Sequence, residues 1–298
     1  MTGPVVVGLD GSPAGITAAW WAAHEATARH LPVVLLHSWT SQPLNVPTLP
    51  QEARSKERYG REILNRTEAE LLHRFGDLAL TTELVSAPAA QELVDRSKDA
   101  SLLVLGSRGH GSLASFVLGS ISLRVLGLAH GPAVTVRAGD PVVEDGWGHP
   151  APADRDEVVV GVREPGPAAD PVLEFAFIEA ASGGTPLRVL RVLPEAGPVP
   201  RPHPRHIAAH RGSEAEATEQ TRLAAAVAPW RRKFPGVPVT QQVVTGHPSQ
   251  VLLTAAAHGR LLVVGRRRHP SHLTWRLGPV AHAALHHVPT PVAVVPHD

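Results

Sequence analysis

The sequence contains no cysteine, and it has only one methionine, one tyrosine and 4% aromatic residues. Without cysteine the chain forms no disulfide, carries no thiolate nucleophile and builds no cysteine-based metal site. It also lacks a basic and apolar leader, and no run reaches the roughly 18 apolar residues that a membrane helix needs. These absences predict a cytoplasmic protein without a signal peptide or a membrane partner.

A strong excess of either charge is missing as well. Lys and Arg total 28, Asp and Glu total 27, and the net charge is +1. The balance predicts no nucleic-acid partner, because such partners select basic surfaces. What the chain does have is length and apolar residues: 298 residues, 43% of them hydrophobic, predict two domains of about 150 residues each.

The two halves repeat one another. Four landmarks recur in the same order, at an offset of 153 residues for the first and 159 for the others. The paired segments are Val5–Gly8 with Val158–Gly161, Leu102–Gly106 with Leu261–Gly265, Gly119 with Gly278, and Pro132–Val136 with Pro291–Val295. We therefore predict domains at 1–138 and 157–298, joined by a linker at 139–156 that is rich in proline and glycine.

Short, continuous Val- and Leu-rich runs alternate with segments of helical spacing. Such runs are typical of strands that a parallel sheet buries on both faces. The predicted strands are Val5–Leu9, Val33–His37, Leu80–Val85, Ser101–Leu105 and Ala133–Arg137, then Val158–Val162, Leu187–Val192, Val239–Val244, Arg260–Val264 and Pro291–Val295. The predicted helices of the first half are Ile16–Arg29, Arg54–Phe75, Ala89–Lys98 and Ile121–Ala129. Each half is thus expected to be an open α/β sandwich with a five-stranded, mostly parallel sheet flanked by helices. The proline-rich stretches Thr40–Gln51 and Pro194–Gly212 are expected to be surface loops.

Polar and glycine residues follow the first and fourth strands of the first half. Asp10 follows the first strand, and Gly106, Gly109 and the pair Gly119-Ser120 follow the fourth. In open α/β sheets ligands bind beyond the carboxyl ends of strands, where the strand order reverses. Glycines let a backbone approach a ligand closely, and a helix N-terminus favours an anion. We expect Gly119 and Ser120 to contact phosphate, and Asp10 to contact a ribose or a metal ion.

Simpler interpretations stand beside this one. Asp10-Gly11-Ser12 is also ordinary turn chemistry, Gly106 and Gly109 also suit a flexible connection, and Ser120 also suits a helix N-cap. Several histidines have spacings that occur in zinc sites. They are His203, His206 and His210, the pair His269 and His272, and the group His282, His286 and His287. Because no cysteine and few carboxylates accompany them, we expect no bound metal of this kind and no catalytic residue.

The first half resembles the universal stress protein family. It matches that family's nucleotide signature G-x2-G-x9-G-[ST] at Gly106, Gly109, Gly119 and Ser120, its first strand ending in Asp10, and its Leu-Leu-His after the second strand. The resemblance covers both halves and implies a protein that binds ATP, with Mg²⁺, and acts in stress adaptation. Carried over by position, it assigns the nucleotide to Asp10, Ser38, Leu105, Gly106, Gly109, Gly119, Ser120 and Ile121.

The second half departs from this signature at each polar position. Arg163 stands where the aspartate is expected, Arg268 replaces the middle glycine, and Pro279 replaces the serine or threonine. Proline removes a backbone donor as well as the hydroxyl, and we expect the Arg268 side chain to enter the space of the phosphate loop. The sequence therefore predicts ATP in the first domain only.

These residues favour a regulatory nucleotide sensor over an enzyme, because no general base and no lysine accompany the glycine loop. Two alternatives remain open: a slow ATPase or phosphotransferase, and a scaffold that binds no nucleotide. The resemblance further implies that the last strands, Ala133–Arg137 and Val292–Val295, pair across the two halves. It also implies a homodimer and a regulatory protein partner.

Overall fold

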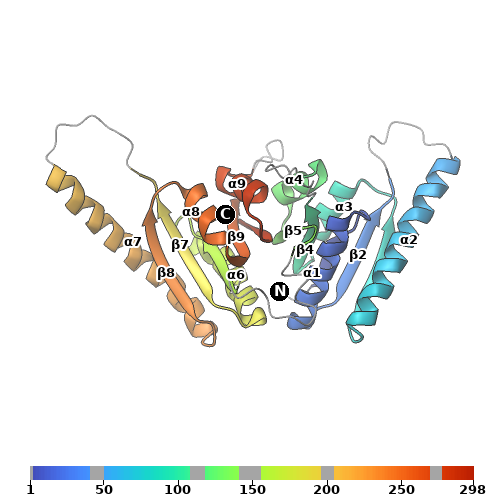
Figure 1. The fold of residues 1–298 in the computed structure, drawn as a ribbon, viewed down its shortest axis with the longest axis horizontal. Coiled ribbons are helices and arrows are strands. Elements are labelled where there is room, and N and C mark those ends of the chain that lie inside the picture. Colours follow the sequence, from blue (N-terminus) through green and yellow to red (C-terminus); the bar gives the residue numbers. More distant parts are fainter. Residues whose placement is uncertain (1–2, 41–49, 108–117, 141–155, 196–204, 269–276) are drawn as a thin grey trace.

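The computed structural model describes residues 3–40, 50–107, 118–140, 156–195, 205–268 and 277–298, and Figure 1 shows their arrangement. The elements of the first half are β1 Val5–Gly8, α1 Pro13–Arg29, β2 Val33–Ser38, α2 Pro50–Arg74, β3 Leu80–Val85, α3 Ala89–Arg96, β4 Leu102–Ser107, α4 Ser120–Leu128 and β5 Ala133–Arg137. Those of the second half are β6 Glu157–Gly161, the short 3₁₀ helix η2 Pro167–Ala169, α6 Asp170–Gly183, β7 Leu187–Leu193, α7 Arg205–Lys233, β8 Val239–Thr245, α8 Pro248–Ala256, β9 Gly259–Arg267, α9 Pro279–His287 and β10 Val292–His297.

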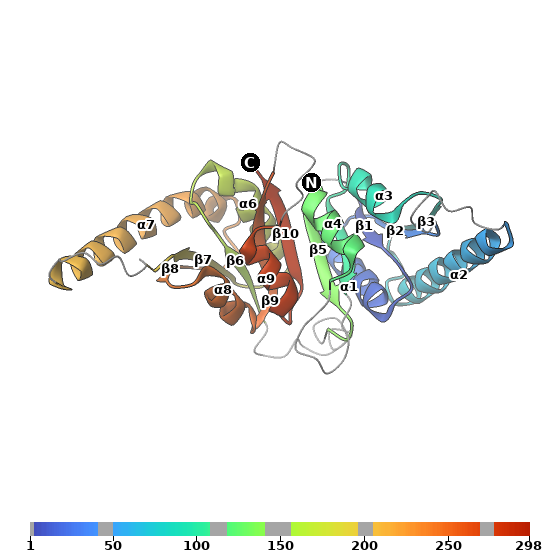
Figure 2. The same cartoon turned by 90° about the horizontal axis from the view of Figure 1, so that it is seen from above.

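All ten described strands form one sheet, in the order β3-β2-β1-β4-β5-β10-β9-β6-β7-β8. Within each half the neighbours are parallel, and between the halves β5 and β10 are antiparallel, with Val134 opposite Ala293. Figure 2 shows these two strands side by side at the centre of the molecule. The predicted five-stranded α/β sandwiches and the pairing of the two last strands are confirmed.

The strands bury side chains on both faces, which explains their continuous apolar runs. Val5 and Val7 pack into the core on one face of the sheet, and Val6 packs into the core on the other. Helices α1, α2, α6 and α7 supply side chains to the first core, and α3, α4, α8 and α9 to the second. Each core contains residues of both halves, so the two domains share their hydrophobic interior.

The predicted loops are shorter in the structure than expected. Helix α2 begins at Pro50, inside the predicted loop 40–51, because proline is well tolerated at the first position of a helix. Helix α7 begins at Arg205, so the prediction of a loop throughout 194–212 is wrong for its last part. The sequence of 205–212 has no apolar periodicity to mark it as helical. The rest of both predicted loops lies largely outside the described residues.

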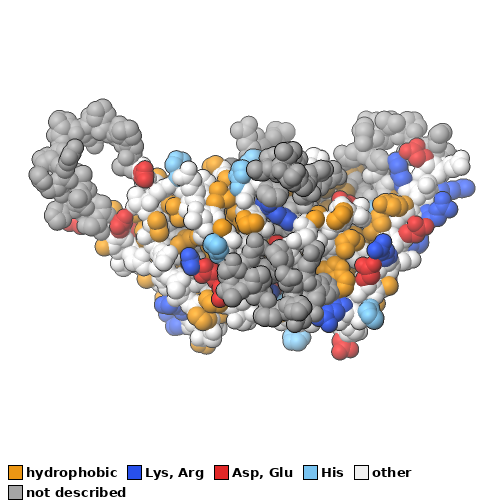
Figure 3. Space-filling model, in the orientation of Figure 1, with side chains coloured by type: hydrophobic (Ala, Val, Ile, Leu, Met, Phe, Trp, Pro, Cys, Tyr) orange, Lys and Arg blue, Asp and Glu red, His pale blue; other side chains and the backbone are white. Residues whose placement is uncertain are grey.

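Long helices at the two ends of the molecule carry mixed charge. On α2, lysines or arginines pair with glutamates one turn away, as in Lys56–Glu52, at 3.0 Å, and Arg61–Glu57, at 2.9 Å. Figure 3 shows basic and acidic side chains interspersed over this helix. None of the helices in the described part of the chain is long and apolar enough to cross a bilayer.

A buried ionic cluster joins the two halves where α1 meets α6. Arg29 of α1 lies 2.9 Å from Glu179 of α6, with 7% and 2% of the two side chains exposed. Beside them, Arg260 of β9 lies 3.4 Å from Glu25 of α1. Burial and the neighbouring Glu25 carboxylate raise the pKa of Glu179 well above its usual value. The domain interface therefore contains two carboxylates and two guanidinium groups that water scarcely reaches.

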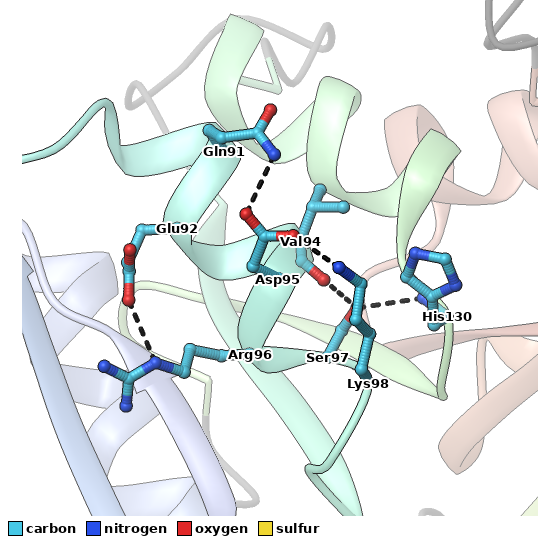
Figure 4. Close-up of polar contacts among 8 residues, drawn as sticks. All are labelled: Gln91, Glu92, Val94, Asp95, Arg96, Ser97, Lys98 and His130. Atoms are coloured by element: carbon cyan, nitrogen blue, oxygen red, sulfur yellow. Dashed lines mark hydrogen bonds and ion pairs between the residues drawn. The ribbon is translucent and has the colours of Figure 1, made fainter.

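A second polar link runs from the end of α3 to β9. The Ser97 hydroxyl donates to the Val94 carbonyl at 2.6 Å and accepts from the His130 backbone N–H at 2.9 Å (Figure 4). The His130 carbonyl in turn accepts from Arg268 of the second half at 3.1 Å. These contacts hold the turn between α4 and β5 against both domains.

Candidate functional site

The strand order of the first half reverses between β1 and β4. β1 pairs with β2 on one side and with β4 on the other, and Gly8 lies opposite Leu105. The carboxyl ends of β1 and β4 therefore lie next to one another, with Asp10 just beyond the first and Gly106 at the second. The structure brings these two predicted site residues to the same edge of the sheet, where ligands of open α/β folds bind.

Asp10 orders the turn that starts α1. Its Oδ1 atom accepts hydrogen bonds from the Ser12 backbone N–H at 2.9 Å and from the Ser12 hydroxyl at 2.6 Å. The Ser12 hydroxyl in turn accepts from the Gly15 N–H and so caps the helix. The turn interpretation of Asp10 is confirmed. Because the side chain is exposed, its carboxylate keeps acceptor capacity for a ligand.

Two further residues of the predicted site line the strand ends. The Ser38 hydroxyl donates a short hydrogen bond to the Ala87 carbonyl, which ties the end of β2 to the loop that precedes α3. Leu105 is 3% exposed and belongs to the core between the sheet and α3 and α4. The hydroxyl oxygen of Ser38 can thus accept a hydrogen bond from a ligand, and Leu105 provides an apolar contact surface.

Gly106 is required by the packing of α1 against β4. A Cβ atom at this position would lie 2.5 Å from the Ala14 carbonyl carbon and 2.6 Å from the Gly15 nitrogen. Its carbonyl accepts from the Ser122 hydroxyl of α4 at 3.4 Å, so the glycine touches two helices at once. The flexible-connection interpretation of Gly106 is therefore wrong. Gly109 lies outside the described residues.

The N-terminus of α4 is open. Gly119 is its N-cap residue, with φ −63° and ψ 151°, and no side chain caps the helix within the described part of the chain. A Cβ atom at Gly119 would meet no atom of the described residues within 4 Å. Ser120 occupies the first helical position, so its interpretation as the N-cap is wrong: the helix begins one residue earlier than that role requires. Ser120 and Ile121 are both exposed, and 47% of Ile121 is accessible.

This helix end has the properties of an anion site. The first N–H groups of a helix lack partners within the helix, and its dipole favours negative charge. Among the described residues no close contact requires glycine at position 119, because none lies within 4 Å of an added Cβ atom. The predicted phosphate contact at Gly119 and Ser120 is thus compatible with the local geometry.

The second half repeats the architecture of this site with other chemistry. Arg163 follows β6 and is exposed, and α9 begins at Pro279 behind its N-cap Gly278, whose φ of −61° and ψ of 160° match those of Gly119. The prediction that Arg268 enters the phosphate space is wrong. β9 continues through Arg267 and its side chains alternate, so Arg268 reaches the His130 carbonyl of the first half.

Sequence reasoning missed a large cavity at the same place in the second half. It measures about 1160 Å³ and lies at the carboxyl ends of β6 and β9, with apolar side chains and several arginines in its wall. The only sequence signal for it is the replacement of polar signature residues by proline and arginine.

The described residues contain no group of three histidines, aspartates or glutamates that could hold a metal ion. The rings of His282 and His286 on α9 lie with their centroids 4.4 Å apart and their planes tilted by 38°, while His203, His269 and His272 lie outside the described residues. In the first half, Asp10 is the one predicted site residue with a carboxylate. A Mg²⁺ ion at this site would take most of its ligands from nucleotide phosphates and water.

Comparisons with known proteins agree with this architecture. The sequence profile described as the universal stress protein family matches residues 1–137 and again 155–296. A universal stress protein of Mycolicibacterium smegmatis is 30% identical over 298 residues, covering 98% of this chain and 96% of that protein. One of Mycobacterium tuberculosis is 30% identical over 299 residues, covering 97% of this chain and 95% of that protein.

A solved universal stress protein from Archaeoglobus fulgidus superposes with a TM-score of 0.71 at 18% identity, and the match covers 99% of this chain and 98% of that one. This likeness shows that the two-domain fold is shared over its full extent. Two family matches in tandem and relatives of nearly equal length lead to one conclusion: the chain belongs to the universal stress protein family, as a member with two copies of the domain.

Proposed function

We propose that the first domain binds ATP at the ends of β1 and β4 and acts as a regulatory nucleotide sensor, while the second domain binds no ATP. The observation that carries this proposal is the N-terminus of α4, which no side chain of the described residues caps and whose N-cap Gly119 meets none of them within 4 Å of an added Cβ atom. The exposed carboxylate of Asp10 follows the neighbouring strand. An anion donor site and a hydroxyl acceptor at one sheet edge suit a nucleotide.

Each residue has a definite part in this proposal. The backbone N–H groups of Ser120 and Ile121 and the Ser120 hydroxyl donate to phosphate oxygens, and Gly119 leaves room for them. Asp10 accepts hydrogen bonds from ribose hydroxyls through the lone pairs that Ser12 leaves unused. Leu105 and Ser38 lie at the ends of the strands on either side of β1, where the base would rest. Gly106 brings α1 close to β4 and so shapes the floor of the site, and Gly109 completes the signature.

Sensing rather than catalysis fits the chemistry of these residues. Asp10, the one carboxylate among them, is already committed to a turn, and no lysine is present to stabilise charge in a phosphoryl-transfer transition state. We infer that bound ATP sets a conformation or a contact with a partner protein. Turnover well above about 1 per second, as in true enzymes, would contradict this and favour an ATPase or phosphotransferase.

The two domains differ in the donor that matters most. In α9 the first position is Pro279, which has neither an N–H nor a hydroxyl, whereas α4 has Ser120 there. Arg163 stands where the ribose acceptor would be. These two changes remove a phosphate donor and the hydroxyl acceptor without altering the backbone of the site.

The variant Ser120→Pro tests this proposal, because it copies the second domain into the first. Proline at the first helical position is well tolerated, as α9 itself illustrates, so the fold should survive. Loss of a charge-assisted hydrogen bond predicts an affinity for ATP that is lower by about ten- to a hundredfold. Isothermal titration calorimetry with ATP and Mg²⁺ measures the affinity and the number of sites per chain.

The matched variant Ser120→Ala keeps the backbone N–H and loses only the hydroxyl, so it should weaken ATP less than Ser120→Pro does. Two equal sites per chain would contradict the asymmetry between the domains. If the wild-type chain does not bind ATP at millimolar concentration, the proposal fails, and the remaining function for both domains is that of a scaffold.

A further inference from the structure

The cavity of the second domain is lined largely by apolar side chains from several elements. It lies between β6, β9, the start of α6 and the first turns of α9, and Val162, Val172, Leu252, Val264 and Val280 contribute to its wall. Its volume of about 1160 Å³ lies just above the range for small-molecule sites, roughly 300–1,000 Å³. A wall of this kind gains free energy by covering an apolar ligand body.

One buried cation in this wall lacks part of its hydrogen bonding. Arg266 is 7% exposed and lines the cavity, and one terminal nitrogen of its guanidinium donates to the Ala129 carbonyl of the first half. Its Nε donor has no hydrogen-bond partner among the described residues. A buried hydrogen-bond donor without a partner costs free energy, so a ligand that brings an acceptor to the Arg266 Nε atom would be stabilised.

Arg266 remains charged under physiological conditions. Burial, with the charge of nearby Arg268, lowers the pKa of Arg266 to about 10, which leaves the guanidinium protonated at neutral pH. A buried cation is stabilised most by an anion that lies within hydrogen-bond distance.

The other charges around the cavity are also mostly positive. Arg163 and Arg267 share one carboxylate, Glu164, at 3.8 Å and 3.7 Å. Arg191 also lines the cavity but pairs with Glu219 at 3.0 Å. Two guanidinium groups against one carboxylate leave the mouth cationic, and long-range attraction favours an anionic ligand.

We propose that this cavity binds a small amphipathic carboxylate, with the chemistry of a medium-chain fatty acid, whose apolar body lies among the valines and leucines and whose carboxylate lies against Arg266. The ligand is an anion because Arg266, Arg163 and Arg267 line the cavity, and its body is apolar because most of the lining residues are apolar. A nucleotide suits the cavity poorly, since Pro279 removes the phosphate donor and Arg163 the ribose acceptor.

The test is calorimetric titration of the full-length chain with sodium octanoate, beside octan-1-ol as the uncharged probe of equal chain length. We expect one octanoate per chain and an affinity for octan-1-ol that is about tenfold lower, because the alcohol lacks the charge-assisted contact. Arg266→Met should lower the affinity for octanoate by about tenfold, and Arg266→Lys, which keeps the charge, should lower it less.

Because Arg266 also contacts the first domain, a change in octanoate binding on its replacement has two possible causes. A second variant, away from that contact, separates them. Gly278 lines the cavity, and a Cβ atom there would meet no atom of the described residues within 4 Å, so Gly278→Phe is expected to place its ring in the cavity. It should abolish octanoate binding, while Gly119→Phe, the same change in the first domain, should leave it intact. The proposal is overturned if octanoate does not bind, if Gly278→Phe leaves its affinity unchanged, or if ATP displaces it. None of these results depends on whether the first domain binds ATP.

Discussion

Replacing Arg29 with methionine is expected to lower the free energy of unfolding by about 3–5 kcal/mol at neutral pH. Arg29 and Glu179 are both almost fully buried and lie 2.9 Å apart at the junction of α1 and α6. Methionine keeps much of the apolar stem but leaves a buried carboxylate without its closest cation. The remaining guanidinium, Arg260, contacts Glu25 rather than Glu179. Urea unfolding followed by circular dichroism measures the loss.

The same cluster predicts how stability changes with pH. Burial and the neighbouring Glu25 raise the pKa of Glu179 well above 4.5. At pH values between 4.5 and this raised pKa, the folded chain therefore binds more protons than the unfolded chain. Its contribution to stability is therefore fully present below about pH 4.5 and is lost as the pH rises through the raised pKa. Arg29→Met should cost less at pH 5.5 than at pH 8, because protonation of Glu179 removes the unpaired charge.

Two variants serve as controls for this prediction. Glu179→Gln removes the titrating group and should flatten the change of stability between these pH values. Arg61→Met breaks an exposed pair with Glu57, whose side chains are 63% and 44% accessible, and should leave stability nearly unchanged. If Arg29→Met costs no more than Arg61→Met, the buried cluster does not hold the domains together.

Gly106→Val is expected to destabilise the chain by about 3 kcal/mol or more. The new Cβ atom would lie 2.5 Å from the Ala14 carbonyl carbon, and a backbone atom cannot move aside as the end of a flexible side chain does. Helix α1 would have to shift away from β4, which also displaces Asp10 from the strand ends. Chemical unfolding measures the loss, and ATP titration should show weakened binding in whatever fraction remains folded.

Gly119→Ala is the matched control, because it adds the first side-chain carbon to the other glycine of the site. Its Cβ atom would meet no described residue within 4 Å, and its φ of −63° suits any residue, so stability should change little while ATP binding weakens. Equal losses of stability in the two variants would mean that the close approach of α1 to β4 is not what requires glycine at position 106.

The architecture followed from local patterns. Continuous apolar runs such as Leu102–Leu105 can only be strands covered on both faces, and their alternation with helical segments predicts parallel crossovers. The start of α7 was not predictable in this way, because the apolar residues that α7 contributes to the core, Leu223 and Val227, lie in its C-terminal half. Pairing of β5 with β10 came from resemblance, since an apolar run does not specify its partner.

The candidate site was predictable in position but not in the role of each residue. A glycine signature places Gly106 and Gly119 at the strand ends, yet it does not distinguish a glycine that packing demands from one that leaves room for a ligand. That distinction depends on Ala14, which lies far from Gly106 in sequence and in contact with it in space. Similarly, the sequence around Arg268 does not predict that its side chain contacts the His130 carbonyl rather than the cavity.

By itself, the sequence of this protein determined the family, the repeat and the strand ends that carry the candidate site residues. Each of these follows from local periodicity or from short motifs. Only the tertiary structure decided which arginines line the second cavity, that Glu25 and Glu179 meet at the domain junction, and why Gly106 and Gly119 differ. These features depend on distances between residues that are remote along the chain, and such distances exist only once the two halves have closed into one sheet.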